Sequence, residues 1–331
     1  MSSTSPIIVA EIGINHGGSL NHAIEIVDEF LAAGARYFKT QIHCFDDEYH
    51  PSALELKPPN ANENIVSLIK RMSLTPEEEI ALHDHIRNRG GIYISTAFSR
   101  KGVEFLDHLG VEIRKIGSGE IGNLPLISKA IVHAKRVIAS TGLHSPQVVG
   151  RAAKLLTRSG VPTTILACTN LYPTRPEESN LAGIETLQKT YPGFDVGFSD
   201  HTVGTSISLA AIARGASLIE RHICLENDSG PDIAASLTPV KFKELLQGAE
   251  AIYEALMNPQ DPDVTAVARF AQSSLVATRD LEVGVSISEQ DLWALRPGTG
   301  DFRGWESDEV IGKTVTKRIL GGDFISRASI G

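Results

Sequence analysis

The chain has 331 residues, enough for one large core and a small additional domain, with 42% hydrophobic and 21% charged residues. Its net charge of −9, without any basic stripe, argues against a nucleic-acid partner. No apolar run approaches the roughly 20 residues of a membrane-spanning helix, and the N-terminal segment lacks the regions of a signal peptide. Three widely spaced cysteines without a CxxC pair exclude a disulfide framework and a cysteine zinc cluster, so we expect a cytoplasmic location.

Short apolar runs alternate with amphipathic segments along most of the chain, which predicts alternating strands and helices. The predicted strands are 7–13, 37–43, 92–97, 112–117, 137–141, 164–169, 196–200 and 218–224. Helices are expected after them, for example at 76–89, where Thr75 and Pro76 are residue types favoured at a helix start. Eight such units in about 255 residues have the number and length of a TIM (β/α)8 barrel.

A doubly wound sheet is the competing architecture, and the ends of the predicted strands separate the two. A doubly wound sheet binds ligands near a switch point, whereas a barrel gathers polar groups from every strand end. Polar residues end or follow all eight predicted strands: Glu11, Lys39, Gln41, His43, Ser95, Thr96, Lys115, Ser118, Glu120, Ser140, Thr141, Thr169, Asn170, Ser199, Asp200, His201, Glu220 and His222. This pattern favours the α/β barrel.

The connection between His43 and Leu74 is unusually long and contains acids, prolines and Asn60. A structureless connection of this length in a compact domain is usually functional, which predicts a lid over the mouth of the barrel. A surface insertion without a function is the alternative.

The pattern changes near residue 257, which predicts that the barrel domain spans 1–257. Residues 258–272 begin with Asn, Pro, Gln and Asp and are predicted to form a linker. Residues 273–331 show brief strands and glycines at turns, which predicts a small, mostly β module.

Residues 117–122 match the GxGxxG pattern of dinucleotide-binding loops. That site also needs an acidic residue about 20 positions further on, at the end of the next strand. The segment 136–142 contains no acid, so the match does not indicate a nicotinamide site. A glycine-rich turn at a helix start still suits a phosphate group.

His201 and His222 end neighbouring strands of the predicted barrel, which places them at the same rim. A metal site or an acid–base pair would need this arrangement. A single histidine at a strand end is more often a simple hydrogen-bonding residue, and both interpretations remain open from the residues alone.

Lys39 and Lys115 lie inside apolar strands, where a surface lysine is unusual. They could bind an anion or form a Schiff base. The anion site is favoured, because an anionic substrate would need a local positive patch on this acidic chain. Four polar residues at neighbouring strand ends would complete it: Ser118, Ser140, Asn170 and Ser199.

Glu11, Glu120 and Asp232 are candidate acids or acceptors for sugar hydroxyls. Asp232 follows Gly230 and Pro231, so ordinary turn chemistry explains it equally well. Arg296 lies in a loop of the C-terminal module, and its spacing alone does not distinguish it from any other loop arginine.

Seven motifs in this order resemble the bacterial N-acetylneuraminate (sialic acid) synthase family: AEIGINH at 10–16, FKTQ at 38–41, STAF at 95–98, KIGSGE at 115–120, CTNLYP at 168–173, SDHT at 199–202 and GPD at 230–232. The C-terminal module resembles the antifreeze-like (SAF) domain of that family in RPGTG at 296–300 and IGK at 311–313. The resemblance covers nearly the whole chain.

The resemblance implies a TIM barrel with an appended SAF domain, in a domain-swapped homodimer where one subunit's small domain covers the partner's barrel. It implies an enzyme that condenses phosphoenolpyruvate with an N-acylmannosamine-type sugar, here N-acetylmannosamine, and uses a divalent metal, typically manganese, with magnesium or cobalt as alternatives. His201 and His222 would bind the metal, and Glu11 and Glu120 would serve a metal-bound water and the sugar. Phosphoenolpyruvate would contact Lys39, Lys115, Ser118, Ser140, Asn170 and Ser199. The other substrate-binding residues would be Gln41, Asn60, Thr96, Tyr172, Asp232 and, from the partner subunit, Arg296.

Some residues depart from the family pattern, such as Ile121 and Gly122 after Glu120, and Ala97 in place of a common proline. His43 is more similar to the neuraminate branch than to the legionaminate branch, although a related sugar or its 6-phosphate remains an alternative acceptor. Two other classes compete: a Schiff-base aldolase, and a non-catalytic barrel whose C-terminal module only binds a partner.

Overall fold

The structure is a computed structural model, and it describes residues 5–57 and 63–331. The chain divides into two compact units, one that ends at Pro259 and one that spans Gln260–Gly331. Each unit is described by itself. In the described residues, no helix is both long enough and apolar enough to cross a membrane.

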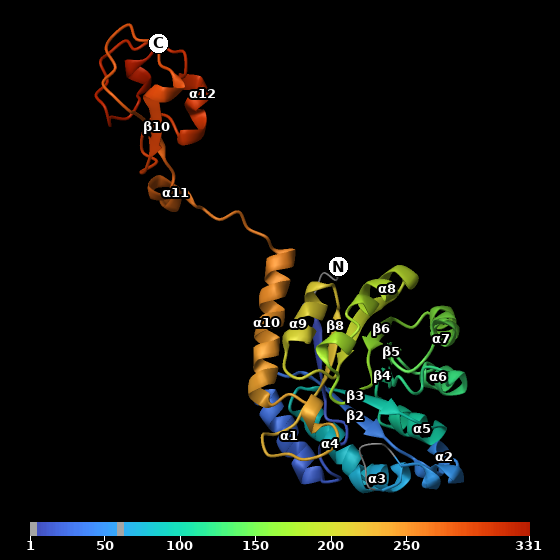
Figure 1. The fold of residues 1–331 in the computed structure, drawn as a ribbon. Coiled ribbons are helices and arrows are strands. Elements are labelled where there is room, and N and C mark those ends of the chain that lie inside the picture. The colour runs from blue at the N-terminus through green and yellow to red at the C-terminus, as the bar shows by residue number, and fades with distance from the viewer. Residues whose placement is uncertain (1–4, 58–62) are drawn as a thin grey trace. The chain divides into compact units, whose positions relative to one another are not determined.

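The first unit is a closed barrel of eight parallel strands, each paired with its neighbours in sequence and β8 with β1 (Figure 1). The strands are β1 (Ile7–Glu11), β2 (Tyr37–Ile42), β3 (Ile92–Ala97), β4 (Ile113–Ile116), β5 (Arg136–Ser140), β6 (Thr163–Cys168), β7 (Asp195–Asp200) and β8 (Leu218–His222). The predicted TIM barrel is confirmed, and every predicted strand overlaps an observed one.

Helices surround the barrel, as Figure 1 shows. They are α1 (Leu20–Ala32), α2 (Phe45–Glu48), α3 (Ile65–Met72), α4 (Pro76–Asn88), α5 (Arg100–His108), α6 (Leu124–Ala130), α7 (Pro146–Ser159), α8 (Ala182–Thr190), α9 (Ser206–Ala213) and α10 (Pro239–Met257), with the short 3-10 helices η1 (Pro51–Glu55), η2 (Pro176–Glu178) and η3 (Ile233–Ala235). The start of α4 is fixed by a capping box in which Thr75 and Glu78 bond each other's backbone N–H groups. This agrees with the helix start predicted from the sequence.

The interior of the barrel is built in layers. Near the amino ends of the strands, buried apolar side chains fill it: Val9, Ile94, Ile138, Leu166 and Leu218. Side chains two residues apart on a strand point to the same face. The residues two positions further along these strands are Glu11, Thr96, Ser140, Cys168 and Glu220, and all five are buried. The apolar layer is therefore the floor on which a polar layer is held.

The sequence analysis expected a structureless connection between β2 and α4, but the structure shows that the described part of this segment is ordered. It contains α2, η1 and α3, and α3 has its own apolar contacts. Leu68 and Met72 of α3 pack against Ile14, which follows β1. Burial of this apolar face holds α3 against the barrel. Ile65, Leu68, Ile69 and Met72 have the i, i+3, i+4, i+7 spacing of an amphipathic helix, a signal in the sequence that the expected structureless connection overlooked.

The second unit has a small separate core that includes Leu275, Leu281, Phe302 and Ile325. Its elements are α11 (Thr265–Ala271), β9 (Ser274–Ala277), η4 (Glu289–Asp291), β10 (Leu292–Leu295), η5 (Gly304–Glu306), α12 (Ser307–Val310) and η6 (Arg327–Ser329). Strands β9 and β10 pair antiparallel. Helix α11 lies within 258–272, the segment that the sequence analysis assigned to a linker.

Candidate active site

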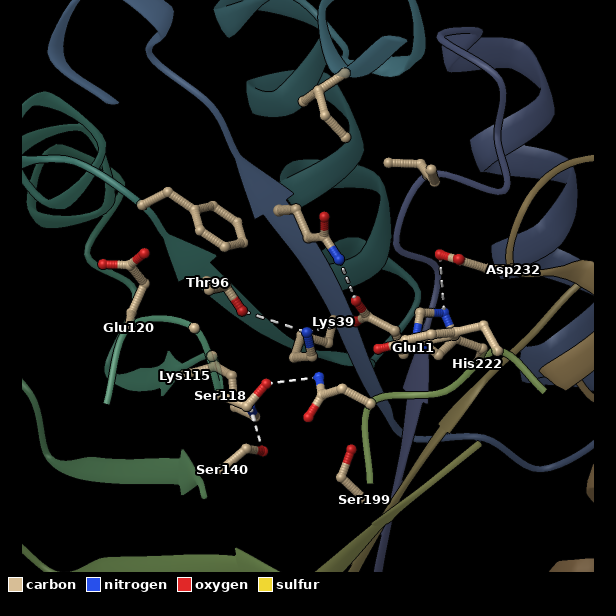
Figure 2. Close-up of a pocket in the computed structure, with 18 of the residues that line it drawn as sticks. Glu11, Lys39, Thr96, Lys115, Ser118, Glu120, Ser140, Ser199, His222 and Asp232 are labelled. Atoms are coloured by element: carbon tan, nitrogen blue, oxygen red, sulfur yellow. Dashed lines mark hydrogen bonds and ion pairs between the residues drawn. The ribbon is translucent and has the colours of Figure 1, made fainter. Parts of the chain in front are cut away.

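A pocket of about 640 Å³ opens at the carboxyl ends of the barrel strands (Figure 2). It brings together the predicted site residues of the first unit that the structure describes: Glu11, Lys39, Gln41, Thr96, Lys115, Ser118, Glu120, Ser140, Asn170, Tyr172, Ser199, His201, His222 and Asp232. Asn60 lies outside the described residues. Arg296 follows β10 in the second unit and is exposed.

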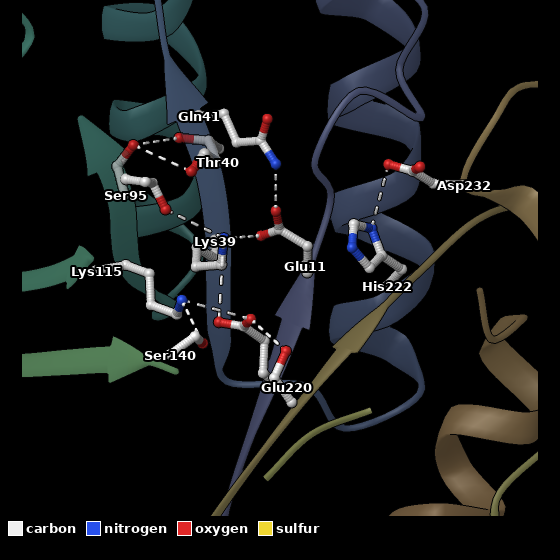
Figure 3. A network of polar contacts seen from close by, with 12 residues as sticks. Glu11, Lys39, Thr40, Gln41, Ser95, Lys115, Ser140, Glu220, His222 and Asp232 are labelled. Carbon is white, nitrogen blue, oxygen red and sulfur yellow. Dashed lines mark hydrogen bonds and ion pairs between the residues drawn. The ribbon is translucent and has the colours of Figure 1, made fainter. Parts of the chain in front are cut away.

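Lys39 is buried in the polar layer and has an acid beside it. Its Nζ lies 2.8 Å from Glu11 Oε2 and 4.0 Å from Glu220 Oε2, and it donates to Thr96 Oγ1 at 3.3 Å (Figure 3). Burial opposes its charge, but the two carboxylates outweigh this and raise the pKa of Lys39 above its ordinary value. Lys39 is therefore a cation at neutral pH.

Lys115 is the second lysine of the pocket floor. It donates to Ser140 Oγ at 2.8 Å and to the carbonyl of Ile116 at 3.1 Å, and its Nζ lies 3.8 Å from Glu220 Oε1. Burial lowers the pKa of Lys115, and nearby Lys39 adds to that effect while Glu220 opposes it. An incoming anion would strengthen the charged form, as an anion site requires.

Glu220 lies between the two lysines, as Figure 3 shows, and Ser199 donates to its Oε1 at 3.0 Å. Burial opposes its ionisation, but Lys115 and Lys39 outweigh burial and lower its pKa to about 2. Glu11 differs, because burial raises its pKa to about 7 against the effect of Lys39. The floor thus holds one acid that is ionised, Glu220, and a second acid, Glu11, whose pKa lies near neutral pH.

The glycine-rich turn after β4 supplies one wall of the pocket. Asn170 Nδ2 donates to Ser118 Oγ at 2.7 Å, which joins the ends of β4 and β6 across the barrel. Glu120, two residues further along, is half-buried and accepts from Asn123 Nδ2 at 2.7 Å. The turn thus supplies Ser118, with its partner Asn170, to the pocket that Lys115 also lines, which suits an anion.

His201 and His222 lie side by side, with ring centroids 5.5 Å apart. His201 Nδ1 lies 2.7 Å from the carbonyl oxygen of Thr169, so Nδ1 carries the proton and Nε2 keeps a lone pair. Burial lowers the pKa of both imidazoles, that of His222 to about 4. Tyr172 packs against both rings, at 4.2 Å and 5.6 Å between centroids.

Comparison with known proteins agrees with this geometry. Residues 26–261, more than half of the chain, match the NeuB family. The chain belongs to the NeuB family.

Relatives of this NeuB chain match along most of its length. The N,N'-diacetyllegionaminic acid synthase of Campylobacter jejuni is 33% identical over 322 residues, which are 94% of this chain and 96% of that protein. The pseudaminic acid synthase of Helicobacter pylori is 30% identical over 310 residues, 89% of each chain. The solved N-acetylneuraminic acid synthetase of Leptospira borgpetersenii is 29% identical with a TM-score of 0.69, and the match covers 80% of this chain and 90% of that one. The predicted resemblance, and with it the prediction of an enzyme, is confirmed.

Two imidazoles of the NeuB pocket are suited to bind a metal ion. Within 5–57 and 63–331, no group of three or more His, Cys, Asp or Glu side chains is placed to hold a metal ion. The pair His201 and His222 does fit two positions, because both rings are neutral and the buried Nδ1 of His222 lacks a hydrogen-bond partner among the described residues. Asp232 Oδ2 is 3.7 Å from that nitrogen.

Several pocket residues of this NeuB chain were given no role from the sequence. Glu220 is one, although its place two residues before His222 on the same strand face was a usable signal. Others come from the lid segment, including Glu48, Tyr49 and Leu68. Their approach to the pocket depends on how α2 and α3 fold back, which no local pattern shows.

Proposed function

We propose that this chain condenses phosphoenolpyruvate with N-acetylmannosamine and releases N-acetylneuraminate and phosphate. The observation that carries the proposal is the pocket floor, where buried Lys39 and Lys115 lie beside the hydroxyl groups of Thr96 and Ser140. Two buried cations on an acidic chain suit a substrate with both a phosphate and a carboxylate. Membership of the NeuB family supports the same reaction.

In the proposed reaction, the enol carbon of phosphoenolpyruvate attacks the aldehyde of the open-chain sugar and a carbon–carbon bond forms. Water adds to C2 of the resulting oxocarbenium ion, and phosphate leaves with cleavage of its C–O bond. Lys39 and Lys115 offset the negative charge of phosphate and carboxylate throughout. Glu11, whose pKa is raised to about 7, is suited to hold or release a proton at the sugar end of the floor.

His201 and His222 would hold a divalent metal, for which manganese is our first choice. Bound there, it would act as a Lewis acid that polarises the sugar aldehyde. Thr169 would orient His201 through the hydrogen bond to Nδ1. Asp232 and Gln41 would accept or donate hydrogen bonds to the sugar hydroxyl groups.

A 2,4-diacetamido-trideoxy sugar is a second candidate acceptor. It is favoured by the similarity to two proteins named N,N'-diacetyllegionaminic acid synthases, at 33% and 30% identity. The same pocket floor would serve either sugar, because phosphoenolpyruvate and the aldehyde carbon are common to both reactions.

We measure phosphate release from phosphoenolpyruvate with manganese and each of these two sugars, with and without EDTA. We expect metal-dependent release with N-acetylmannosamine as the better acceptor. Release with the diacetamido sugar alone would assign the second candidate. No release with either sugar, or covalent trapping by borohydride, would contradict the proposed synthase and support the Schiff-base alternative.

His222→Ala tests the metal assignment. The variant is expected to lose manganese binding, followed by electron paramagnetic resonance of the free ion, together with at least about 100-fold in kcat. His133→Ala, at an exposed turn before β5, is the matched control and should bind manganese like the unaltered protein. Full manganese affinity in His222→Ala would remove this residue from the ligand set.

A further inference from the structure

The charges of the pocket are unevenly distributed. The described residues that line it include two lysines, Lys39 and Lys115, and no arginine. Both lysines are buried in the floor. Acids line it as well: Glu11, Glu48, Glu120, Glu220 and Asp232. Figure 2 shows Glu120 and Asp232 on opposite sides of the floor lysines. An anion held by the lysines therefore leaves a pocket whose remaining charged side chains are carboxylates.

The lid side of the pocket is a stack of rings that fixes His43. The His43 ring stacks on Phe98 at 4.5 Å between centroids and 9° between planes, and on Phe45 at 6.2 Å and 17°. Phe45 in turn stacks on Tyr49 at 6.3 Å. Because the imidazole is buried and stacked on these rings, its ring plane is held and its two nitrogens keep fixed directions.

His43 lies between the lid and the catalytic floor and contacts both. Its Nδ1 lies 2.9 Å from Glu48 Oε1, and its Nε2 lies 3.4 Å from Gln41 Oε1. Gln41 Nε2 then donates to Glu11 Oε1 at 2.8 Å. Nδ1–H of His43 must donate to the Glu48 carboxylate, so the carboxylate is held at the pocket wall by a fixed ring.

The helix that carries Glu48 is also anchored from outside. Asp47 Oδ1 accepts from Arg100 Nε at 3.1 Å, and Asp47 Oδ2 accepts from the backbone N–H of Lys101 at 3.0 Å. Asp47 thus ties α2 to the start of α5 on the barrel. The side chain of Glu48 is only 8% exposed, so it cannot turn out into solvent without breaking these contacts.

We propose that this pocket accepts an uncharged N-acylated sugar, and that Glu48, held by His43, excludes sugar phosphates. The inference rests on the proposed function, since it assumes that phosphoenolpyruvate occupies the floor lysines. A sugar 6-phosphate would bring roughly −1.5 to −2 further charges into a pocket with no lysine or arginine left to oppose them, since the divalent metal proposed at His201 and His222 would be engaged by the sugar aldehyde. An uncharged sugar meets only hydrogen-bonding groups there, and carboxylates are strong acceptors for its hydroxyls.

Cations from elsewhere in the chain are the alternative source of a phosphate site. Residues 58–62, outside the described part, are Pro, Pro, Asn, Ala and Asn and add no lysine or arginine. Arg296, predicted to reach the sugar from the partner subunit, is the remaining candidate. The experiment therefore includes Arg296→Ala as a separate arm.

The test compares kcat/KM for N-acetylmannosamine and its 6-phosphate in the unaltered enzyme, with the 2,4-diacetamido sugar as a second uncharged acceptor. We expect at least tenfold preference for an uncharged sugar. Glu48→Gln keeps an acceptor for His43 but removes the charge, so the preference should narrow by about tenfold, which corresponds to about 1.4 kcal/mol. Both sugars are compared in one preparation, so any unfolded fraction cancels from the ratio.

Glu55→Gln is the matched control, because Glu55 lies in the same lid segment, is exposed and does not line the pocket. Its ratio should equal that of the unaltered enzyme. Equal or better use of the 6-phosphate by the unaltered enzyme would overturn the inference and leave the synthase proposal intact, and Arg296→Ala would then show whether Arg296 is the cation responsible. An unchanged ratio in Glu48→Gln would overturn the role of Glu48. If none of the sugars leads to phosphate release, the proposed function is contradicted, and the inference with it.

Discussion

At the scale of single residues, positive and negative side chains alternate in the pocket floor. Glu220 lies between Lys39 and Lys115 and lets two lysines stay buried without a ligand. Buried charges without partners are costly, so the acid stabilises the free enzyme. A substrate anion that binds the lysines must compete with Glu220 for them, which limits affinity but leaves the site preorganised.

Gly142 lies where this floor has no room for a side chain. A β-carbon at this position would clash with Asn170 Oδ1 and would lie 2.8 Å from the carbonyl oxygen of Cys168. Gly142→Ala should push Asn170 away from Ser118 and raise the KM for phosphoenolpyruvate roughly tenfold, with a loss of about 1–3 kcal/mol in the free energy of unfolding. Gly193→Ala, where a β-carbon meets open space, is the control. An unchanged KM in Gly142→Ala would show that Asn170 does not contribute to binding.

At the scale of elements, the two faces of β2 serve different purposes. Lys39 and Gln41 point into the pocket, whereas Thr40 points outward and bonds Tyr93 of β3, with 2.6 Å between Thr40 Oγ1 and the Tyr93 hydroxyl oxygen. That hydroxyl donates to Glu79 Oε2 of α4 at 2.9 Å. Helix α4 therefore fixes β2 and β3 from outside while their inner faces bind ligand.

Glu79 should make stability depend on pH. Burial raises its pKa from 4.5 to about 7, so the folded state binds a proton that the unfolded state has lost between those values. The contribution of protonated Glu79 to the free energy of unfolding is fully present below about pH 4.5 and is lost as the pH rises to about 7. Glu79→Gln should therefore gain stability relative to the unaltered protein between pH 5 and pH 8, by a change on the order of 3 kcal/mol at most.

Denaturant unfolding at both pH values measures this change. Glu77→Gln, an exposed neighbour on the same helix, should show the same pH dependence as the unaltered protein. If Glu79→Gln and Glu77→Gln behave alike, Glu79 is ionised in the folded state throughout and the argument from burial is wrong.

At the scale of the whole molecule, the second unit has a core of its own and exposes large apolar side chains such as Phe270, Trp293 and Trp305. A contact with another subunit would remove such side chains from water. The proposed domain-swapped dimer would cover it against the partner's barrel and bring Arg296 to the sugar.

Complementation between two variants of low activity tests the swap. Arg296→Ala damages only the second unit, and Lys115→Met damages only the barrel. If each site combines one subunit's barrel with its partner's second unit, mixed dimers contain one intact site and a random mixture should regain about a quarter of the unaltered rate. No recovery after dissociation and remixing, with mixed dimers verified by mass spectrometry, would contradict the swap.

The sequence by itself determined the barrel and most of its floor. Strand ends in a parallel barrel must meet at one rim, so residues such as Lys39, Lys115 and His222 are brought together by period-2 spacing and topology alone. The confirmed barrel and family follow from that local pattern and from motifs spread along the chain.

Only the tertiary structure decided the remaining features. It gave Glu220 its place between two lysines, the ordered lid helices and the fixed position of Glu48. These depend on contacts between segments whose packing no local periodicity encodes, such as the stack of His43 on Phe98. The electrostatic energy of a pocket likewise depends on the distances between its charges, and a sequence shows which charges are present but not how far apart they lie.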